Sequence, residues 1–235
     1  MISFILLCSS VGCLENGKPG PSENSHLEGK HRAYTFQDNT FIEITPSSAN
    51  PGTPVQTSFQ DPPPIPGDLP SSWDMRNAIY TDLTGDGKPE IVLLVWRPWR
   101  DWPIMRWSKT PSPIAGFHDM DGDSCHIILI DPHPYEDTGA TSASSRSYRE
   151  IWAGSALPVP LIQIAAGDID GDDANELIAL EGTYTNGRDG AGNRMAVWRW
   201  NGFGFTMQWR SEQAECTGLA LEDVNGDGIA DIITW

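Results

Sequence analysis

An acidic nine-residue pattern occurs three times in this chain of 235 residues. Each copy has an oxygen-bearing side chain at positions 1, 3, 5 and 9, and a Gly at position 4. The copies are residues 82–90, 168–176 and 223–231, and each follows an apolar stretch and leads into a β-prone run. Because Asp, Asn and Gly favour turns, the pattern predicts the same turn between two strands in each repeat.

A hairpin pattern completes the repeat. Residues 195–209 alternate around a Gly-containing turn, and residues 126–152 contain the same arrangement with a longer loop. One unit is therefore strand, acidic loop, strand and hairpin, which is the four-stranded blade of a β-propeller. Residues 34–44 match the hairpin half of a blade, and the chain ends after the other half of one. We expect these two halves to pair.

The expected fold class is all-β, a β-propeller-like array of four-stranded blades. The sequence accounts for about three blades, and N- and C-terminal strands could close the array. Ring propellers typically have four to eight blades. Three interpretations stay open: an open array, a fragment of a longer propeller, or two chains that combine as a homodimer.

Composition divides the chain into a leader, a tether and the repeat domain. Residues 1–13 are apolar and end in small residues before Cys13. They resemble a bacterial lipoprotein leader with Cys13 as the lipidated residue; an ordinary secretory leader and a misassigned start codon are the alternatives. Residues 14–32 form a polar tether, and residues 33–235 form the repeat domain, with a Pro-rich linker at 46–70. We therefore expect an extracellular or cell-envelope protein that a lipid anchor could attach to a membrane.

The net charge is −17, from 15 basic and 32 acidic residues. This balance argues against nucleic acid and anionic membrane surfaces as partners. Two cysteines of the repeat domain, Cys125 and Cys216, could form a disulfide in an exported chain or remain buried thiols. Their spacing fits no zinc motif.

The acidic loops are candidate calcium sites, up to three in number. Calcium takes about six to eight oxygen ligands, and the donors here are oxygens without His or Cys. Side chains would supply positions 1, 3, 5 and 9, and the backbone carbonyl would supply position 7. In the first loop Thr84 replaces the acid at position 3, so we expect weaker binding there. The candidate ligands are Asp82, Thr84, Asp86, Lys88, Glu90, Asp168, Asp170, Asp172, Ala174, Glu176, Asp223, Asn225, Asp227, Ile229 and Asp231.

The alternative is that these segments are turns and nothing more, but three copies in register favour the metal. A fourth stretch, Asp119–Asp123, begins in the same way, but position 9 is Ile127, so we interpret it as a turn. EF-hands need flanking helices and a Glu at position 12, and both are missing here.

The three loops resemble FG-GAP repeats, also called VCBS-type repeats, of integrin α-subunit propellers and bacterial surface proteins. The resemblance covers roughly residues 73–235. It implies calcium bound in loops within blades, a structural role for the ion, and service in adhesion or protein–protein contact. The copy number departs from the family, in which six or seven blades are usual.

The sequence contains no pattern that indicates an enzyme. It has no nucleophile elbow, no zinc-protease motif and no Gly-rich phosphate loop after a strand. We therefore expect a calcium-binding surface binding or adhesion module. The alternative is a carbohydrate-associated enzyme or an accessory glycan-binding domain.

The segment 96–107 contains four Trp and three Arg. Both residue types are common in binding surfaces, and Trp rings stack on sugars. Their partner would be a protein or a glycan; alternatively, these side chains cover the end of the sheet. The candidate ligand-binding residues are Trp96, Trp99, Arg100, Trp102 and Trp107.

Overall fold

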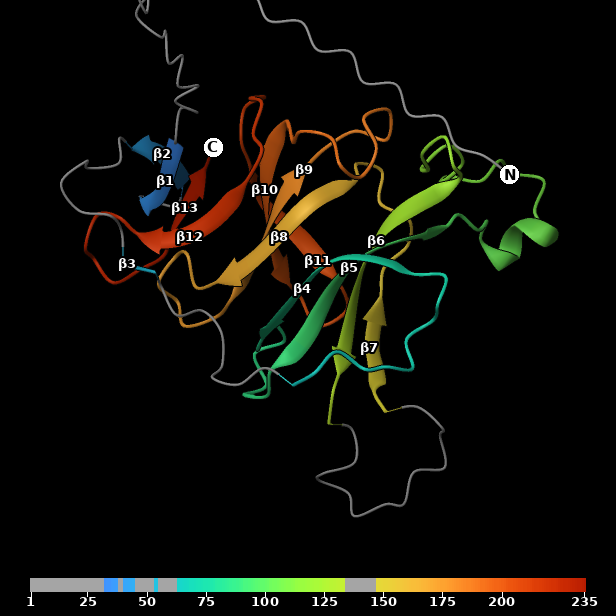
Figure 1. Cartoon of the computed structure of the whole chain (residues 1–235), viewed down its shortest axis with the longest axis horizontal. Helices are drawn as coiled ribbons and strands as arrows, with labels where there is room; N and C mark the ends of the chain where they lie inside the picture. The colour runs from blue at the N-terminus through green and yellow to red at the C-terminus, as the bar shows by residue number, and fades with distance from the viewer. Residues whose placement is uncertain (1–31, 38–39, 45–52, 55–62, 134–146) are drawn as a thin grey trace, which may run out of the picture.

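The computed structural model describes residues 32–37, 40–44, 53–54, 63–133 and 147–235 (Figure 1). Cys13 and the expected leader lie outside these residues, as does nearly all of the expected tether. The described chain is all-β, with three antiparallel sheets and a single short 3-10 helix, η1 (Pro103–Arg106). No helix among the described residues has the length and apolar character that crossing a membrane requires.

Two of the sheets are four-stranded meanders, as the repeat pattern predicted. The first sheet has the order β4-β5-β6-β7, and the second has the order β11-β10-β9-β8. Strands of the first are β4 (Asp74–Thr81), β5 (Glu90–Pro98), β6 (Asp123–Asp131) and β7 (Arg149–Ala153). Strands of the second are β8 (Leu161–Gly167), β9 (Glu176–Glu181), β10 (Arg194–Trp200) and β11 (Phe205–Arg210).

The third sheet combines both ends of the chain, in the order β2-β1-β13-β12-β3. Its strands are β1 (Arg32–Gln37), β2 (Thr40–Ile44), β3 (Thr53–Pro54), β12 (Leu219–Asp223) and β13 (Asp231–Thr234). Strand β1 pairs with β13 in antiparallel register, from Arg32 opposite Thr234 to Tyr34 opposite Ile232. The expected pairing of the two half-blades is therefore confirmed. The described sheets form no closed ring, so closure and the number of blades stay predictions.

The second sheet lies between the other two, and its central strand β9 shows how the core is divided. Leu177 and Ala179 belong to an apolar cluster shared with β5 and β6 of the first sheet. Ile178 and Leu180 belong to a second cluster with Tyr34 and the third sheet. Because neighbouring residues of a strand point to opposite faces, a continuous apolar run buries both faces of β9.

The outer face of the first sheet packs against the end of the Pro-rich segment. Leu69 and Trp73 contact the buried cluster that contains Leu93 of β5 and Ile128 of β6. Figure 1 shows this segment crossing over the first sheet. A strap of irregular chain thus covers the face on which a further sheet would otherwise pack. Earlier in the same segment, Thr53–Pro54 forms β3 and pairs with β12.

The disulfide alternative for the two body cysteines is wrong. Cys125 and Cys216 are both free and buried, and they lie in different apolar clusters. Burial raises the pKa of the Cys125 thiol to about 12. The Cys125 sulfur instead accepts a hydrogen bond from the Leu161 amide at 3.3 Å, which joins the first sheet to the second.

Removal of the β1–β2 hairpin should destabilise the third sheet. Without it, β13 becomes an unpaired edge, and the buried ring of Tyr34 no longer packs on Trp209. Loss of a large buried aromatic side chain costs about 3–5 kcal/mol. A chain that begins at residue 45 should therefore unfold at lower denaturant than one that begins at Arg32, and should aggregate in light scattering. Equal unfolding midpoints and no aggregation would contradict this role of the hairpin.

Candidate functional site

The three acidic loops occupy the same place in their sheets. Each joins the first strand to the second: β4 to β5, β8 to β9, and β12 to β13. The loops also contact one another in sequence order. Asn175 of the second loop donates a hydrogen bond to the Asp82 carbonyl of the first at 2.9 Å. The Ala230 amide of the third loop donates to the Asp168 carbonyl of the second at 3.4 Å.

The carboxylate at position 1 organises each loop by accepting backbone amide hydrogen bonds. Asp223 accepts from Gly226 at 2.6 Å and from Gly228 at 2.9 Å. Asp82 and Asp168 accept from the same two positions, 4 and 6, of their own loops. The position-1 carboxylate therefore closes each turn through these two hydrogen bonds.

Two positions in each turn require a left-handed backbone. Position 4 is Gly in all three loops, with φ between 74° and 83°. Position 6 is Gly87, Asp173 and Gly228, with φ of 83°, 67° and 89°. Asp173 is the single non-Gly residue with positive φ among the described residues. The sequence analysis had predicted that the turn needs Gly at position 4, but it had not predicted the left-handed backbone at position 6.

The acid at position 9 begins the second strand and is buried. Glu90, Glu176 and Asp231 are exposed by 3%, 2% and 1%, respectively. Each accepts a hydrogen bond from the amide at position 2 of its loop. Burial raises the pKa of Glu90 and, together with the nearby charge of Asp170, raises that of Glu176 to about 7. A carboxylate in this position is stabilised by a neighbouring cation.

Carboxylates converge closely in two of the loops. Ligand oxygens of Asp82, Asp86 and Glu90 lie within 4.8 Å of one another, as do those of Asp168, Asp170 and Glu176. Within the described part of the chain, the carboxylates of the third loop form no such group. There Asn225 directs its Nδ2 to Thr35 of β1 at 3.1 Å.

The donor set of the second loop fits calcium. Glu176 Oε1 is buried and has no hydrogen-bond partner. A cavity of about 260 Å³ reaches Asp170 and Glu176 and gives an ion access to them. Asp168, Asp170, Asp172 and Glu176 are all oxygen donors, which hard cations such as calcium prefer. When bound, the ion would neutralise these carboxylates.

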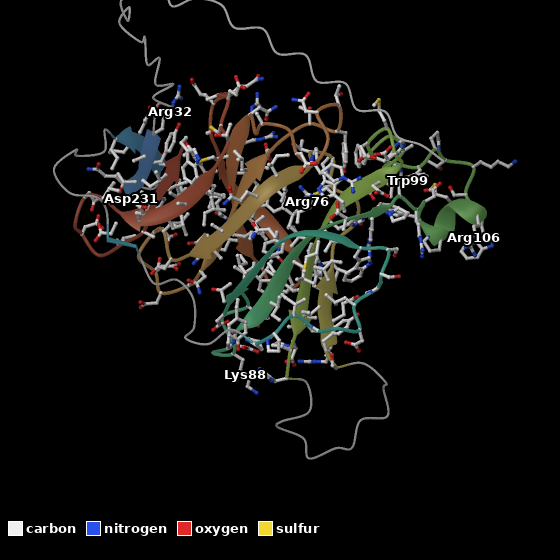
Figure 2. All side chains as sticks on the ribbon, viewed as in Figure 1. Arg32, Arg76, Lys88, Trp99, Arg106 and Asp231 are labelled. Atoms are coloured by element: carbon white, nitrogen blue, oxygen red, sulfur yellow. The ribbon has the colours of Figure 1, made fainter. Side chains whose placement is uncertain are left out.

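The remaining candidate ligands have local partners. The Thr84 hydroxyl donates a hydrogen bond to Glu90 at 2.8 Å. At position 7, the amides of Lys88, Ala174 and Ile229 donate to the position-5 carboxylate of their own loop. Figure 2 shows Lys88 of the first loop and Asp231 of the third at separate places.

Arg199 of β10 was missed by the sequence analysis. Its guanidinium contacts Asp172, lies 3.7 Å from Asp170, and lies 3.5 Å from Glu176 Oε1. This contact lowers the pKa of Asp172. The most complete of the three loops therefore already has a cationic side chain beside its carboxylates. No sequence signal indicated this contact, because strand β9 separates β10 from the loop along the chain.

The Asp119–Asp123 stretch is a turn, as expected, and an arginine neutralises it. Arg188 lies 2.8 Å from Asp119 and 2.9 Å from Asp123, and it also pairs with Asp74 at 2.7 Å. Asp119 further accepts the amide of Asp123. The guanidinium thus takes the place that a metal would need.

The Trp- and Arg-rich segment is split between core and surface. Trp96 is fully buried against Tyr184, and Trp99 donates its indole N–H to the Ile114 carbonyl at 3.0 Å. Trp107 is 78% exposed and lies outside the nearby pocket. Only Arg100 and Trp102, of the five candidates, line that pocket.

The pocket lies at the end of the first sheet opposite the acidic loop, and we call it the basic pocket. It has a volume of about 480 Å³. The sequence analysis singled out the segment that contains Arg97 but did not name Arg97, Trp73 or His126 as candidates, because these three come from separate segments. The lining residues are Pro70, Ser72, Trp73, Arg97, Pro98, Arg100, Trp102, Ile114, His126, Ala153, Gly154, Ser155 and Ala156.

Comparison with known proteins gives no match: no family model, no curated protein and no solved structure is significantly similar to this chain.

Substitution of Gly226 by Ala should destabilise the third loop. Its φ is 83°, and a left-handed backbone costs an ordinary residue about 1–2 kcal/mol. Denaturant unfolding should therefore show a loss of about this size. Gly67→Ala is the matched control, because φ at Gly67 is not positive and no atom lies within 4 Å of the added Cβ. Equal losses of stability in the two variants would show that the left-handed backbone at Gly226 does not require a glycine.

His126 should make the fold acid-sensitive. Burial and the charge of Arg97 lower its pKa from 6.5 to about 4. The unfolded chain therefore binds a proton on this histidine more readily than the folded chain does. The contribution of neutral His126 to the free energy of unfolding is complete above pH 6.5, and it is lost progressively as the pH falls toward 4. The loss has a ceiling of about 3 kcal/mol. The difference in unfolding free energy between pH 7 and pH 5 should shrink in His126→Gln and persist in His118→Gln. An unchanged difference in His126→Gln would refute the prediction.

Proposed function

We propose that the protein is an exported repeat protein of the β-propeller type, in which calcium stabilises the acidic loops and the surface serves as a binding or adhesion module. The buried Glu176 oxygen without a hydrogen bond, beside converging carboxylates, carries this proposal. The shared amide hydrogen bonds of the loops support it further, since they fix the side chains around one point in each turn. The ion would have a structural role.

Contacts between the sheets support the propeller interpretation. Strand β4 contacts β8, and β8 contacts β12, so the first strands of successive sheets are neighbours. First strands line the axis in a propeller, where the blades are arranged around a central channel. The FG-GAP resemblance of the loops agrees with this arrangement. A homodimer that joins two such arrays, and lipidation at Cys13, belong to the same proposal.

A binding module is favoured over an enzyme by the way the acidic groups are used. Carboxylates that could act as acid and base are engaged by loop amides or by arginine. At the basic pocket the Ser124 hydroxyl lies 2.8 Å from Nε2 of His126, but Ser124 is fully buried and does not line the pocket, so this pair offers no accessible nucleophile. The surface activity proposed here is therefore recognition of a ligand.

Calcium should raise the melting temperature, and a chelator should lower it. A ligand that binds only the folded state adds about 2.7 kcal/mol per site at a hundredfold excess over Kd. Calorimetric titration should show one ion fewer for Asp170→Ala, which removes one of the converging carboxylates of the second loop, and a smaller effect for Thr84→Ala. Identical melting curves in chelator and in millimolar calcium would overturn the proposal.

Arg199→Gln provides a matched test at the second loop. Removing the competing guanidinium should tighten calcium binding there by about tenfold, which corresponds to about 1.4 kcal/mol. Arg194→Gln removes the same charge from the same strand, and no contact joins Arg194 to the loop. It should leave the affinity unchanged. Equal affinities in both variants would show that Arg199 does not compete with the ion.

A further inference from the structure

Arg97 is a half-buried cation without an anionic partner in a protein of net charge −17. Other half-buried arginines, such as Arg188 and Arg210, pair with carboxylates. Among the described residues, Arg97 forms no ion pair. Glu150 acts on it only through its charge, whereas burial lowers the pKa of Arg97. A desolvated guanidinium of this kind is stabilised by an anion from outside the chain.

The surroundings of Arg97 suit a ligand rather than a structural ion pair. Its guanidinium lies over the Trp73 ring, 5.7 Å from the centroid, and 3.3 Å from His126 Nδ1. Neither neighbour is charged near neutral pH: the Trp73 indole has no ionisable group, and the pKa of His126 is lowered to about 4. They fix the position of the cation without neutralising it. Arg100 adds a second, exposed guanidinium at the same pocket.

The pocket also has the size and composition for a small polar molecule with an apolar face. Its volume of about 480 Å³ lies within the range of small-molecule sites. Trp102 lines it and is 39% exposed, so its ring offers a stacking surface. Ser72 and Ser155 also line the pocket and bring hydroxyl groups to it.

We propose that the basic pocket binds a carboxylate-bearing sugar. The carboxylate would pair with the Arg97 guanidinium, whose planar fork matches it in two parallel hydrogen bonds. The sugar ring would stack on Trp102, and its hydroxyls would bond to the Ser72 and Ser155 side chains. This inference rests on the proposed function of a surface binding module and names the ligand class of that module.

A sugar fits this pocket better than an acidic peptide segment does. The site is concave and of limited volume, whereas peptide strands and helices bind along extended edges and grooves. The combination of one half-buried cation, an exposed indole ring and several small hydroxyls also matches a ring that has both a charge and hydroxyl groups. An acidic peptide remains an outcome that the test can detect.

The test is calorimetric titration of the full chain in calcium and low salt, with D-glucuronate and D-glucose as probes. The two sugars differ by a carboxylate in place of a hydroxymethyl group. We expect glucuronate to bind at least tenfold more tightly than glucose, because the charge is the main contact. Acetate should bind more weakly than glucuronate, since it has no ring to stack.

Variants separate the two contacts. Arg97→Gln should weaken glucuronate at least tenfold, while Arg106→Gln, which removes the same charge at η1 outside the pocket (Figure 2), should leave it unchanged. Trp102→Ala should weaken glucuronate and leave acetate unaltered. If Arg97→Gln does not fold, the Trp102→Ala result and the comparison of the wild-type sugars decide the question.

Several outcomes would overturn the proposal. These are equal affinity for glucuronate and glucose, unchanged binding in a folded Arg97→Gln, or binding of a Glu-rich peptide with none of glucuronate. The last result would assign the pocket to a protein partner. Calcium-dependent melting is measured on the same samples. A protein that calcium stabilises but that ignores glucuronate refutes only this inference, whereas a calcium-insensitive protein refutes the proposed function.

Discussion

The structure depends on the hydrogen bonds that one carboxylate makes at the start of each acidic loop. Asp82, Asp168 and Asp223 each accept amides from positions 4 and 6 and so reverse the chain between the first and second strands. The position-9 acid is drawn into the sheet by the same turn. Three sheets with this turn in the same place can stack through their apolar faces. The turn therefore fixes the geometry on which the core is built.

The same turns concentrate negative charge, and the molecule balances it differently at each one. In the second loop Arg199 pairs with Asp172, whereas in the Asp119–Asp123 turn Arg188 pairs with both Asp119 and Asp123. In the first loop a hydroxyl, that of Thr84, is bonded to the buried Glu90. Acidic turns of the same molecule thus have unlike electrostatics. Since neighbouring loops are joined by Asn175 and Ala230, an ion in one loop would also stiffen the next.

The two proposed roles, stabilisation by calcium and recognition of a ligand, would lie at opposite ends of the first sheet. The acidic loop lies where β4 meets β5, and the basic pocket lies beyond the other ends of those strands. Arg97 and Trp96 are adjacent in sequence, yet Trp96 is buried in the core and Arg97 lines the pocket. Alternation along β5 explains this division, because neighbouring residues face opposite sides of the strand. A rigid sheet positions the cation, and irregular segments complete the site around it.

The sequence by itself determined the strand order of the repeating unit and the place of each acidic loop. These features follow from local turn chemistry and from the period of two along a strand, which act over a few residues. Only the tertiary structure decided the partners of the charges. Arg188 and Asp74 are 114 residues apart, and the pocket combines Trp73, Arg97 and His126 from three segments. It also left the two cysteines apart and used a Pro-rich strap to cover the first sheet. Such contacts depend on how finished sheets pack, and no local pattern encodes that packing.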